Sequence, residues 1–152
     1  MVVVFRAKRW VLAALAVSAG VVGGWAVVAP RSFNNSFPSP GHAWVRVLGP
    51  YNEHLVRDVG TLYLVLLVVS VWGVLRPTTQ GFALAGAVWL VFSVPHLMYH
   101  LAHLEMYGAV DRAGNVISLG GTVLLAGLLL LPAQAGTRRH HNPDADGPSA
   151  PC

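Results

Sequence analysis

The sequence predicts an all-α membrane protein, a four-helix bundle with an extracytoplasmic loop between its first and second helices. Only 11% of the 152 residues are charged, whereas a typical soluble domain has about 25%. Hydrophobic residues make up 55% of the chain, and most of them fall in four long runs. The basic residues stand singly or in small groups at the ends of these runs. That distribution is typical of topology signals, and it excludes a nucleic-acid-binding surface.

The first run, residues 10–29, is the first expected membrane span. It carries no charge and follows Arg6, Lys8 and Arg9. At 1.5 Å per residue it covers about 30 Å, which is the thickness of the hydrocarbon core. The run is too long for the apolar region of a secretory signal peptide, and Pro30 would follow the cleavage point. We therefore expect an uncleaved helix.

The segment from Arg31 to Glu53 is rich in Pro, Asn and Ser and predicts a loop. Its apolar patch, Ala43-Trp44-Val45, is expected at the membrane interface, where Trp is common. The second span is predicted over residues 57–75, and Arg76-Pro77 ends it.

The third span is predicted over residues 81–104 and the fourth over residues 113–135. The third carries no formal charge apart from its three histidines. A tail rich in Pro, Asp and Gly follows, and we expect it to be disordered. The chain is thus divided into a membrane domain, residues 1–136, and a cytoplasmic tail, residues 137–152.

The basic residues also predict the orientation. Six fall on the side of the termini and four on the side of the loop between the first two helices. The six are Arg6, Lys8, Arg9, Arg76, Arg138 and Arg139; the four are Arg31, Arg46, Arg57 and Arg112. By the positive-inside rule, we expect a multi-pass protein of the cell membrane with both termini cytoplasmic.

Cysteine usage excludes one class of chemistry. The only cysteine is Cys152. A single thiol forms no intramolecular disulfide and no CxxC motif, so dithiol membrane oxidoreductases are excluded.

Polar residues gather at the predicted outer ends of the second and third spans. His96, His100 and His103 share a stripe about 60° wide on a helix. His54 and Asp58 are four residues apart, so they also share a helix face. Because ionisable groups in a bilayer turn toward partners inside the bundle, we expect the two stripes to face each other.

These five residues predict a transition-metal site. Imidazole and carboxylate ligands suit Zn, Fe or Cu, and three histidines with one carboxylate leave room for redox or hydrolytic chemistry. Four further residues are expected to support the site from nearby: Glu53, Arg57, Tyr99 and His42. Asp111 and Arg112 are interpreted instead as a solvated turn.

Three alternatives remain open. The cluster also suits, as a second hypothesis after the metal site, a haem-binding electron carrier with His54 facing His96 or His100. It also suits a polar pocket that handles protons or binds a substrate. In a non-enzymatic membrane subunit, the cluster would seal a helix interface while the loop docks a membrane partner or a second copy. The sequence does not decide whether the chain is an enzyme, and beyond the lipid bilayer it identifies no partner.

Two strings carry a resemblance to a known family. They are PYNEHLVRDVG at residues 50–60 and VPHLMYHLAH at residues 94–103. Over roughly residues 37–131 the chain resembles a family of small actinobacterial four-helix membrane proteins of unknown function. The resemblance implies the topology and no activity. A remoter similarity, in architecture only, is to DoxX-like four-helix proteins, some of which serve quinone-linked oxidation.

Overall fold

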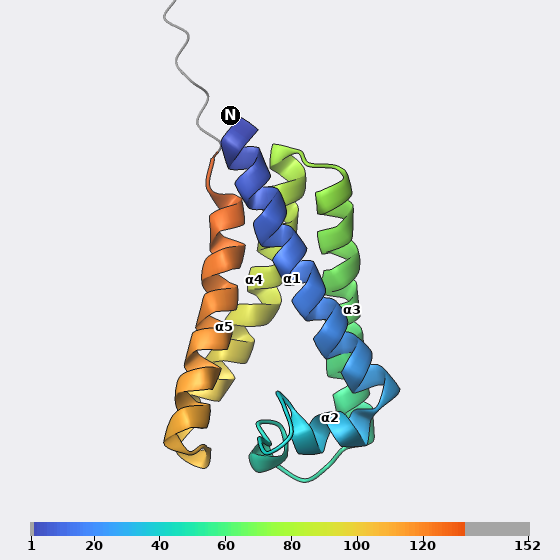
Figure 1. Ribbon diagram of the computed structural model, residues 1–152, viewed down its shortest axis with the longest axis vertical. Coiled ribbons are helices and arrows are strands. Elements are labelled where there is room, and N and C mark those ends of the chain that lie inside the picture. Colours follow the sequence, from blue (N-terminus) through green and yellow to red (C-terminus); the bar gives the residue numbers. More distant parts are fainter. Residues whose placement is uncertain (1, 133–152) are drawn as a thin grey trace, which may run out of the picture.

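The computed structural model describes residues 2–132, and this part of the chain is helical without strands (Figure 1). Its elements, in order, are α1 (Val2–Val28), α2 (Pro30–Ser36), the 3-10 turn η1 (Arg46–Leu48), α3 (Glu53–Leu75), α4 (Thr79–Ala102), the 3-10 turn η2 (Leu104–Met106) and α5 (Ala109–Leu130). The predictions for residues 133–136 and for the tail lie outside the described residues.

Four of the helices are long and apolar enough to cross a membrane. They are α1, α3, α4 and α5, so the predicted all-α class with four spans is confirmed. The boundaries differ from the expected ones where caps fix them. Asn52 accepts a hydrogen bond from the Leu55 amide at 3.2 Å, so α3 begins at Glu53. Thr78 caps α4 in the same way, through the amide of Gly81 at 3.0 Å.

The short helix α2 was not expected, because its segment was interpreted as part of a loop. Pro30 occupies the first turn of α2, where its missing amide hydrogen costs nothing. Phe33 is buried, and its ring packs edge-to-face on Trp25 of α1 with centroids 5.7 Å apart. A small apolar cluster of Ala26, Phe33 and Val56 thus joins α2 to α1 and α3.

The four long helices form two close pairs. A Cβ added to Gly23 of α1 would lie 2.8 Å from the carbonyl oxygen of Gly60, so the backbones of α1 and α3 touch. A Cβ added to Gly86 of α4 would lie 2.8 Å from the carbonyl oxygen of Ala126 in α5. Small residues therefore allow the two helix backbones of each pair to approach closely.

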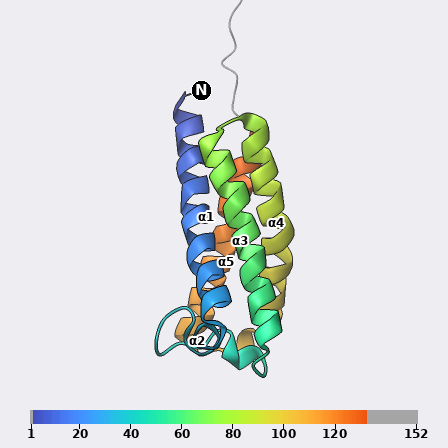
Figure 2. The same cartoon turned by 90° about the vertical axis from the view of Figure 1, so that its right-hand side faces the viewer.

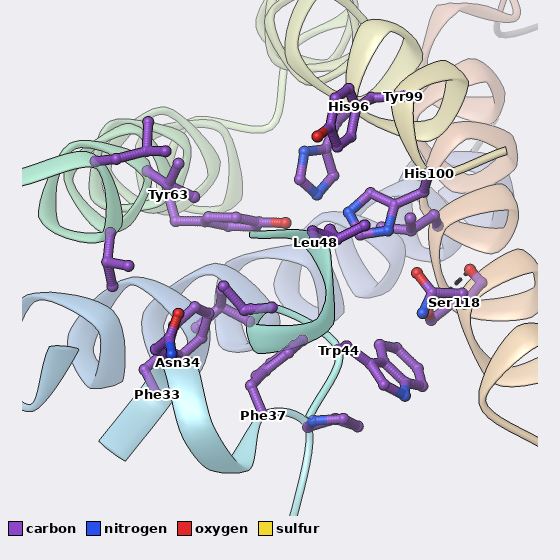
Figure 3. A pocket seen from close by; sticks show the side chains of 18 of the residues that line it. Phe33, Asn34, Phe37, Trp44, Leu48, Tyr63, His96, Tyr99, His100 and Ser118 are labelled. Carbon is purple, nitrogen blue, oxygen red and sulfur yellow. Dashed lines mark hydrogen bonds between the residues drawn. The ribbon is translucent and has the colours of Figure 1, made fainter. Parts of the chain in front are cut away.

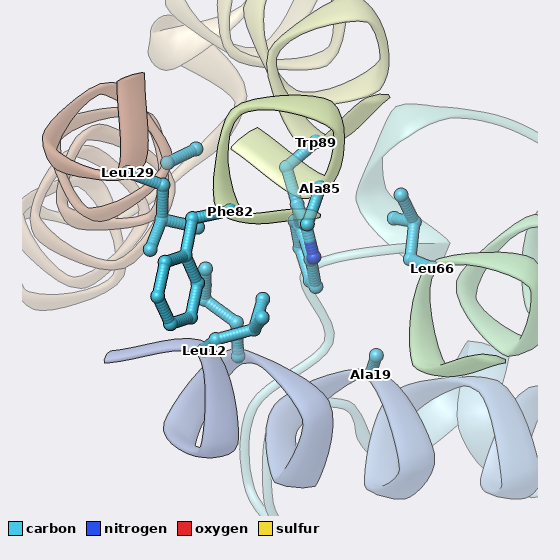
Figure 4. Close-up of a cluster of buried hydrophobic side chains, with 9 residues drawn as sticks. Leu12, Ala19, Leu66, Phe82, Ala85, Trp89 and Leu129 are labelled. Carbon is cyan, nitrogen blue, oxygen red and sulfur yellow. The ribbon is translucent and has the colours of Figure 1, made fainter. Parts of the chain in front are cut away.

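The larger apolar core holds the two pairs together (Figure 4). It includes Leu12 and Leu15 of α1, Phe82 and Trp89 of α4, and Leu129 of α5. At the end of the bundle away from this core, α1 and α5 separate. Helix α2 and the loop that follows it lie across that end (Figures 1 and 2). We call this the loop end; α1 ends there and α3 begins there.

Lys8 closes the bundle at the opposite end. Its side chain is buried, and Nζ donates to the carbonyl oxygen of Leu129 at 2.9 Å and to that of Leu131. These carbonyls lie at the C-terminus of α5, where a helix favours a cation. One of the basic residues interpreted as topology signals is therefore also a helix cap.

Candidate functional site

A cavity of about 500 Å³ lies at the loop end, between the two helix pairs (Figure 3). All four long helices line it, together with α2 and the loop. Its walls are mostly apolar and aromatic, and they include Phe33, Phe37, Trp44, Val56 and Trp89. Asp, Glu, Lys and Arg are missing from the lining. An apolar cavity of this size with few polar groups is typical of small-molecule sites.

The cavity extends from the loop into the apolar part of the bundle. Asn52, just before α3, lines it near the loop, and Tyr63 lines it 11 residues further along. At 1.5 Å per residue, this separation is about 16 Å. The cavity thus reaches along α3 for a distance that is roughly half the thickness of a hydrocarbon core. Next to it, the Trp89 indole donates to Ser70 Oγ at 2.8 Å and ties α4 to α3.

His96 and His100 are the two predicted site residues that the structure brings together. Both line the cavity, and their ring centroids are 4.7 Å apart (Figure 3). His100 is 9% exposed, and His96 stacks on Phe92 with centroids 5.2 Å apart. Both histidines therefore turn into the bundle, as the sequence predicted. Tyr99 also lines the cavity and is half exposed.

His103 does not continue this face. Helix α4 ends at Ala102, and His103 is its C-cap. The predicted stripe assumed that His103 was still helical, so its side chain does not point where the stripe required. Its Nδ1 lies 2.7 Å from the carbonyl oxygen of Tyr99, and its ring stacks on the Tyr99 ring at 4.3 Å. His103 is not among the residues that line the cavity.

His54 and Asp58 lie on the outside of α3. They contact each other at 3.3 Å, but their side chains are 87% and 57% exposed. The inward face of α3 carries Val56, Val59 and Tyr63 instead. Within residues 2–132, no group of three or more His, Cys, Asp or Glu is placed to hold a metal ion. The structure therefore does not bring the five predicted ligands together.

Glu53 and Arg57 form a surface ion pair at 2.9 Å. Arg57 also donates to the carbonyl oxygen of Val27, so the pair joins the start of α3 to the end of α1. Tyr51 donates to Glu53 at 3.2 Å, and partial desolvation together with this carboxylate raises the pKa of Tyr51. The role of these residues in this structure is to fix the helix ends.

The loop is attached to α5 by Asp111, which sequence reasoning placed in a solvated turn. Its Oδ1 pairs with His42 Nδ1 and accepts a hydrogen bond from the Trp44 indole at 2.9 Å. A Cβ added to Gly114 would lie 2.8 Å from Trp44 Cζ2, so the indole packs directly on the backbone of α5. His42 thus supports the loop over the cavity, and within residues 2–132 no hydrogen bond or ion pair joins it to His54.

Tyr107 and Asn115 are the functional candidates that sequence reasoning missed. The Tyr107 hydroxyl lies 2.9 Å from the carbonyl oxygen of Trp44 and 3.1 Å from His100 Nδ1. Burial, with Tyr99 and Asp111 nearby, raises the pKa of Tyr107 to about 12. The hydroxyl therefore keeps its proton at neutral pH.

Asn115 of α5 lines the cavity and is 1% exposed. Its Oδ1 and Nδ2 make no hydrogen bond of good geometry to the described residues, although the side chain lies beside His100. Buried amides in folded proteins are nearly always paired, so this side chain needs an explanation. The sequence did carry a signal, because an amide inside an apolar span is costly and is usually functional.

In comparisons with protein-family models, curated proteins and solved structures, no match to this chain was found. The family resemblance carried by residues 50–60 and 94–103 therefore stays a prediction.

Proposed function

We propose that this integral membrane protein binds a neutral, lipid-soluble small molecule in the cavity at the loop end. The observation that carries the proposal is an apolar cavity of about 500 Å³ whose wall holds the buried amide of Asn115, which makes no hydrogen bond of good geometry. An unpaired buried amide costs about 1–3 kcal/mol. A ligand with one polar group would remove that cost while its apolar part covers the aromatic walls.

The absence of ionised groups from the lining supports a neutral ligand. Burying a charge without a partner costs far more than burying a hydroxyl or a carbonyl group. The lining offers two phenols, amides, hydroxyls and two imidazoles, and no carboxylate, ammonium or guanidinium group. A neutral molecule that partitions into the bilayer meets these conditions, because it reaches the cavity without crossing water.

A transition metal or haem stays an alternative prediction with less support. His96 and His100 supply two adjacent imidazoles, whereas zinc sites use three or four protein ligands. A third suitable ligand is not placed beside them within residues 2–132.

The proposed orientation puts both termini in the cytoplasm, as the basic residues predict. The loop end and the cavity then lie on the extracytoplasmic side. A homo-oligomer or a membrane partner stays a prediction, and the cavity requires neither, because one chain supplies its lining.

Filling the cavity tests the proposal. Val59→Trp places an indole in the cavity, and Val65→Trp is the matched control, because Val65 lies on the same helix and is 51% exposed. We expect a neutral molecule that co-purifies with the wild type in mild detergent to be lost from Val59→Trp and retained by Val65→Trp. Mass spectrometry of organic extracts measures it, and metal analysis of the same samples tests the alternative. The same co-purifying molecules in all three proteins would overturn the proposal.

A further inference from the structure

The hydrogen-bonding side chains of the cavity gather at one end of it. The amides and imidazoles that line it are those of Asn34, Asn52, His96, His100 and Asn115. The two deepest, His96 and Asn115, lie six residues, or about 9 Å, from the loop-side ends of α4 and α5. The part of the cavity near the loop end is therefore the part that suits the polar group of a ligand.

Deeper in the bundle, the lining offers less hydrogen bonding. Ser18 donates to the carbonyl oxygen of Leu15 at 2.8 Å, and Thr122 donates to that of Ser118 at 2.9 Å, so both hydroxyls are paired within their own helices. Valine, leucine and aromatic rings make up most of the remaining lining at this depth, where Tyr63 adds a phenol. This part of the cavity suits a hydrocarbon chain.

The length of the cavity matches one leaflet of a bilayer. From Asn52 to Tyr63 it reaches about 16 Å along α3. A hydrocarbon core is about 30 Å thick, so the chains of one leaflet span about 15 Å. The charged residues Glu53, Arg57 and Asp111 belong at the interface, and all three lie at the loop end. A lipid of this leaflet therefore fits with its head at the loop end and its chain in the deeper part.

The deeper part of the cavity opens sideways between α1 and α5, which separate toward the loop end (Figure 1). Ser18 on α1 and Ser118 on α5 both line the cavity, and both are exposed. We call the gap between these two residues the lateral opening. They lie ten and nine residues from the loop-side ends of their helices, which is about 14–15 Å. The lateral opening therefore faces hydrocarbon.

We infer that the ligand is a neutral lipid of the leaflet on the loop side, bound with its polar head at the loop end and with one chain leaving through the lateral opening. The inference rests on the proposed function and names the ligand class and its orientation in the same cavity. A head such as glycerol both donates and accepts hydrogen bonds. It therefore suits the amides and imidazoles whichever imidazole nitrogen carries the hydrogen.

Two photoreactive forms of monopalmitoylglycerol test the ligand and its orientation. One carries a diazirine near the ester, and the other carries it near the methyl end of the chain. Full-length protein in lipid nanodiscs is irradiated with each form, with and without an excess of plain monopalmitoylglycerol, and mass spectrometry locates the labels that the excess removes. We expect the first form to label the cavity near His96 and Tyr99, and the second to label α1 and α5 near Ser18 and Ser118.

A variant that narrows the lateral opening gives the matched comparison. Ser118→Trp places an indole at its edge. The control is Ile117→Trp, because Ile117 is the neighbouring residue on α5, is 73% exposed and does not line the cavity. The chain must displace the indole in Ser118→Trp, so we expect this variant to need about tenfold more lipid for the same labelling. Ile117→Trp should label like the wild type, and equal labelling of the two variants would contradict the inference.

The wild-type labels decide the inference even if a variant fails to fold. Leu55 and Tyr99 are also exposed and line the cavity nearer the loop end. Labels from the second form beside these two residues would overturn the inference, because the chain would then leave between α3 and α4. Absence of labels that the excess removes, with both forms, would overturn it as well. The proposed function is decided separately, by the co-purification comparison of Val59→Trp with Val65→Trp.

Discussion

Tyr107 joins three parts of the chain through a single hydroxyl. It belongs to the turn between α4 and α5, it donates to Trp44 in the loop, and it contacts His100 at the end of α4. Nearby, Trp44 donates to Asp111 at 2.9 Å, and Asp111 also pairs with His42. The position of the loop over the cavity and the orientation of His100 therefore depend on the same tyrosine.

The raised pKa of Tyr107 gives a prediction for alkaline pH. In the folded protein its pKa is about 12, against an ordinary value of 10.0. Between these values the unfolded chain holds fewer protons at this residue than the folded chain. Stability should therefore be complete below pH 10 for this group and should fall as the pH rises toward 12.

Thermal unfolding in detergent at several pH values checks this. We expect the wild type to lose stability more steeply than Tyr107→Phe over that window, because the variant has no proton to release at this position. Parallel declines of the two proteins would mean that Tyr107 ionises equally in the folded and unfolded states.

At the scale of elements, the loop is a fixed roof over the cavity and is not a free connection. The second apolar cluster holds α2 against α1 and α3, and the indole of Trp44 packs on Gly114 of α5. The contact with Gly114 is close, because an added Cβ would lie 2.8 Å from the indole. The absence of a side chain at this one position lets the roof reach α5.

Gly114→Ala should therefore loosen the roof. The matched control is Gly120→Ala on the same helix, where an added Cβ meets nothing within 4 Å. Both changes raise helix propensity by about 1 kcal/mol, but only the first forces Trp44 away, at a typical overpacking cost of about 1–3 kcal/mol. We expect faster proteolysis of the loop between α2 and α3 in Gly114→Ala alone. Equal cleavage rates in the two variants would show that the roof does not depend on this contact.

The rotation of α3 is one feature of the site that sequence reasoning predicted wrongly. His54 and Asp58 were expected to face the histidines of α4, but Gly60 packs against Gly23 and Ala26 of α1. Residues two apart on a helix point about 200° apart, so a Gly60 turned toward α1 sends Asp58 outward. The spacing of His54 and Asp58 shows only that they share a face. Which way that face points is decided by where small residues allow close packing.

At the scale of the whole molecule, the number of spans was predictable because apolar length alone sets it. The cavity was not, because it depends on how two helix pairs diverge. His96 and His100 were expected to turn into the bundle, and both line the cavity. Tyr107 and Asp111 were missed because their partners, His100, Trp44 and His42, are contacts between separate elements.

Lys8 provides the last prediction, because it joins the two helix pairs at the end opposite the cavity. It lies on α1, and its two acceptors are carbonyls at the end of α5, 121 and 123 residues away along the chain. Lys8→Met keeps the length of the side chain but removes the donor. The carbonyls of Leu129 and Leu131 then lose a charged partner, a loss of about 1.5–3 kcal/mol in similar hydrogen bonds.

Arg9→Met is the matched control, because it removes one positive charge at the neighbouring position, which is exposed. We expect Lys8→Met to unfold at a clearly lower temperature than the wild type in detergent, and Arg9→Met to stay close to the wild type. If both variants lost the same stability, the effect would come from the charge of the N-terminal segment and not from the bridge to α5. Because both changes weaken the positive-inside signal equally, a topology reporter should not distinguish them, whereas thermal unfolding should.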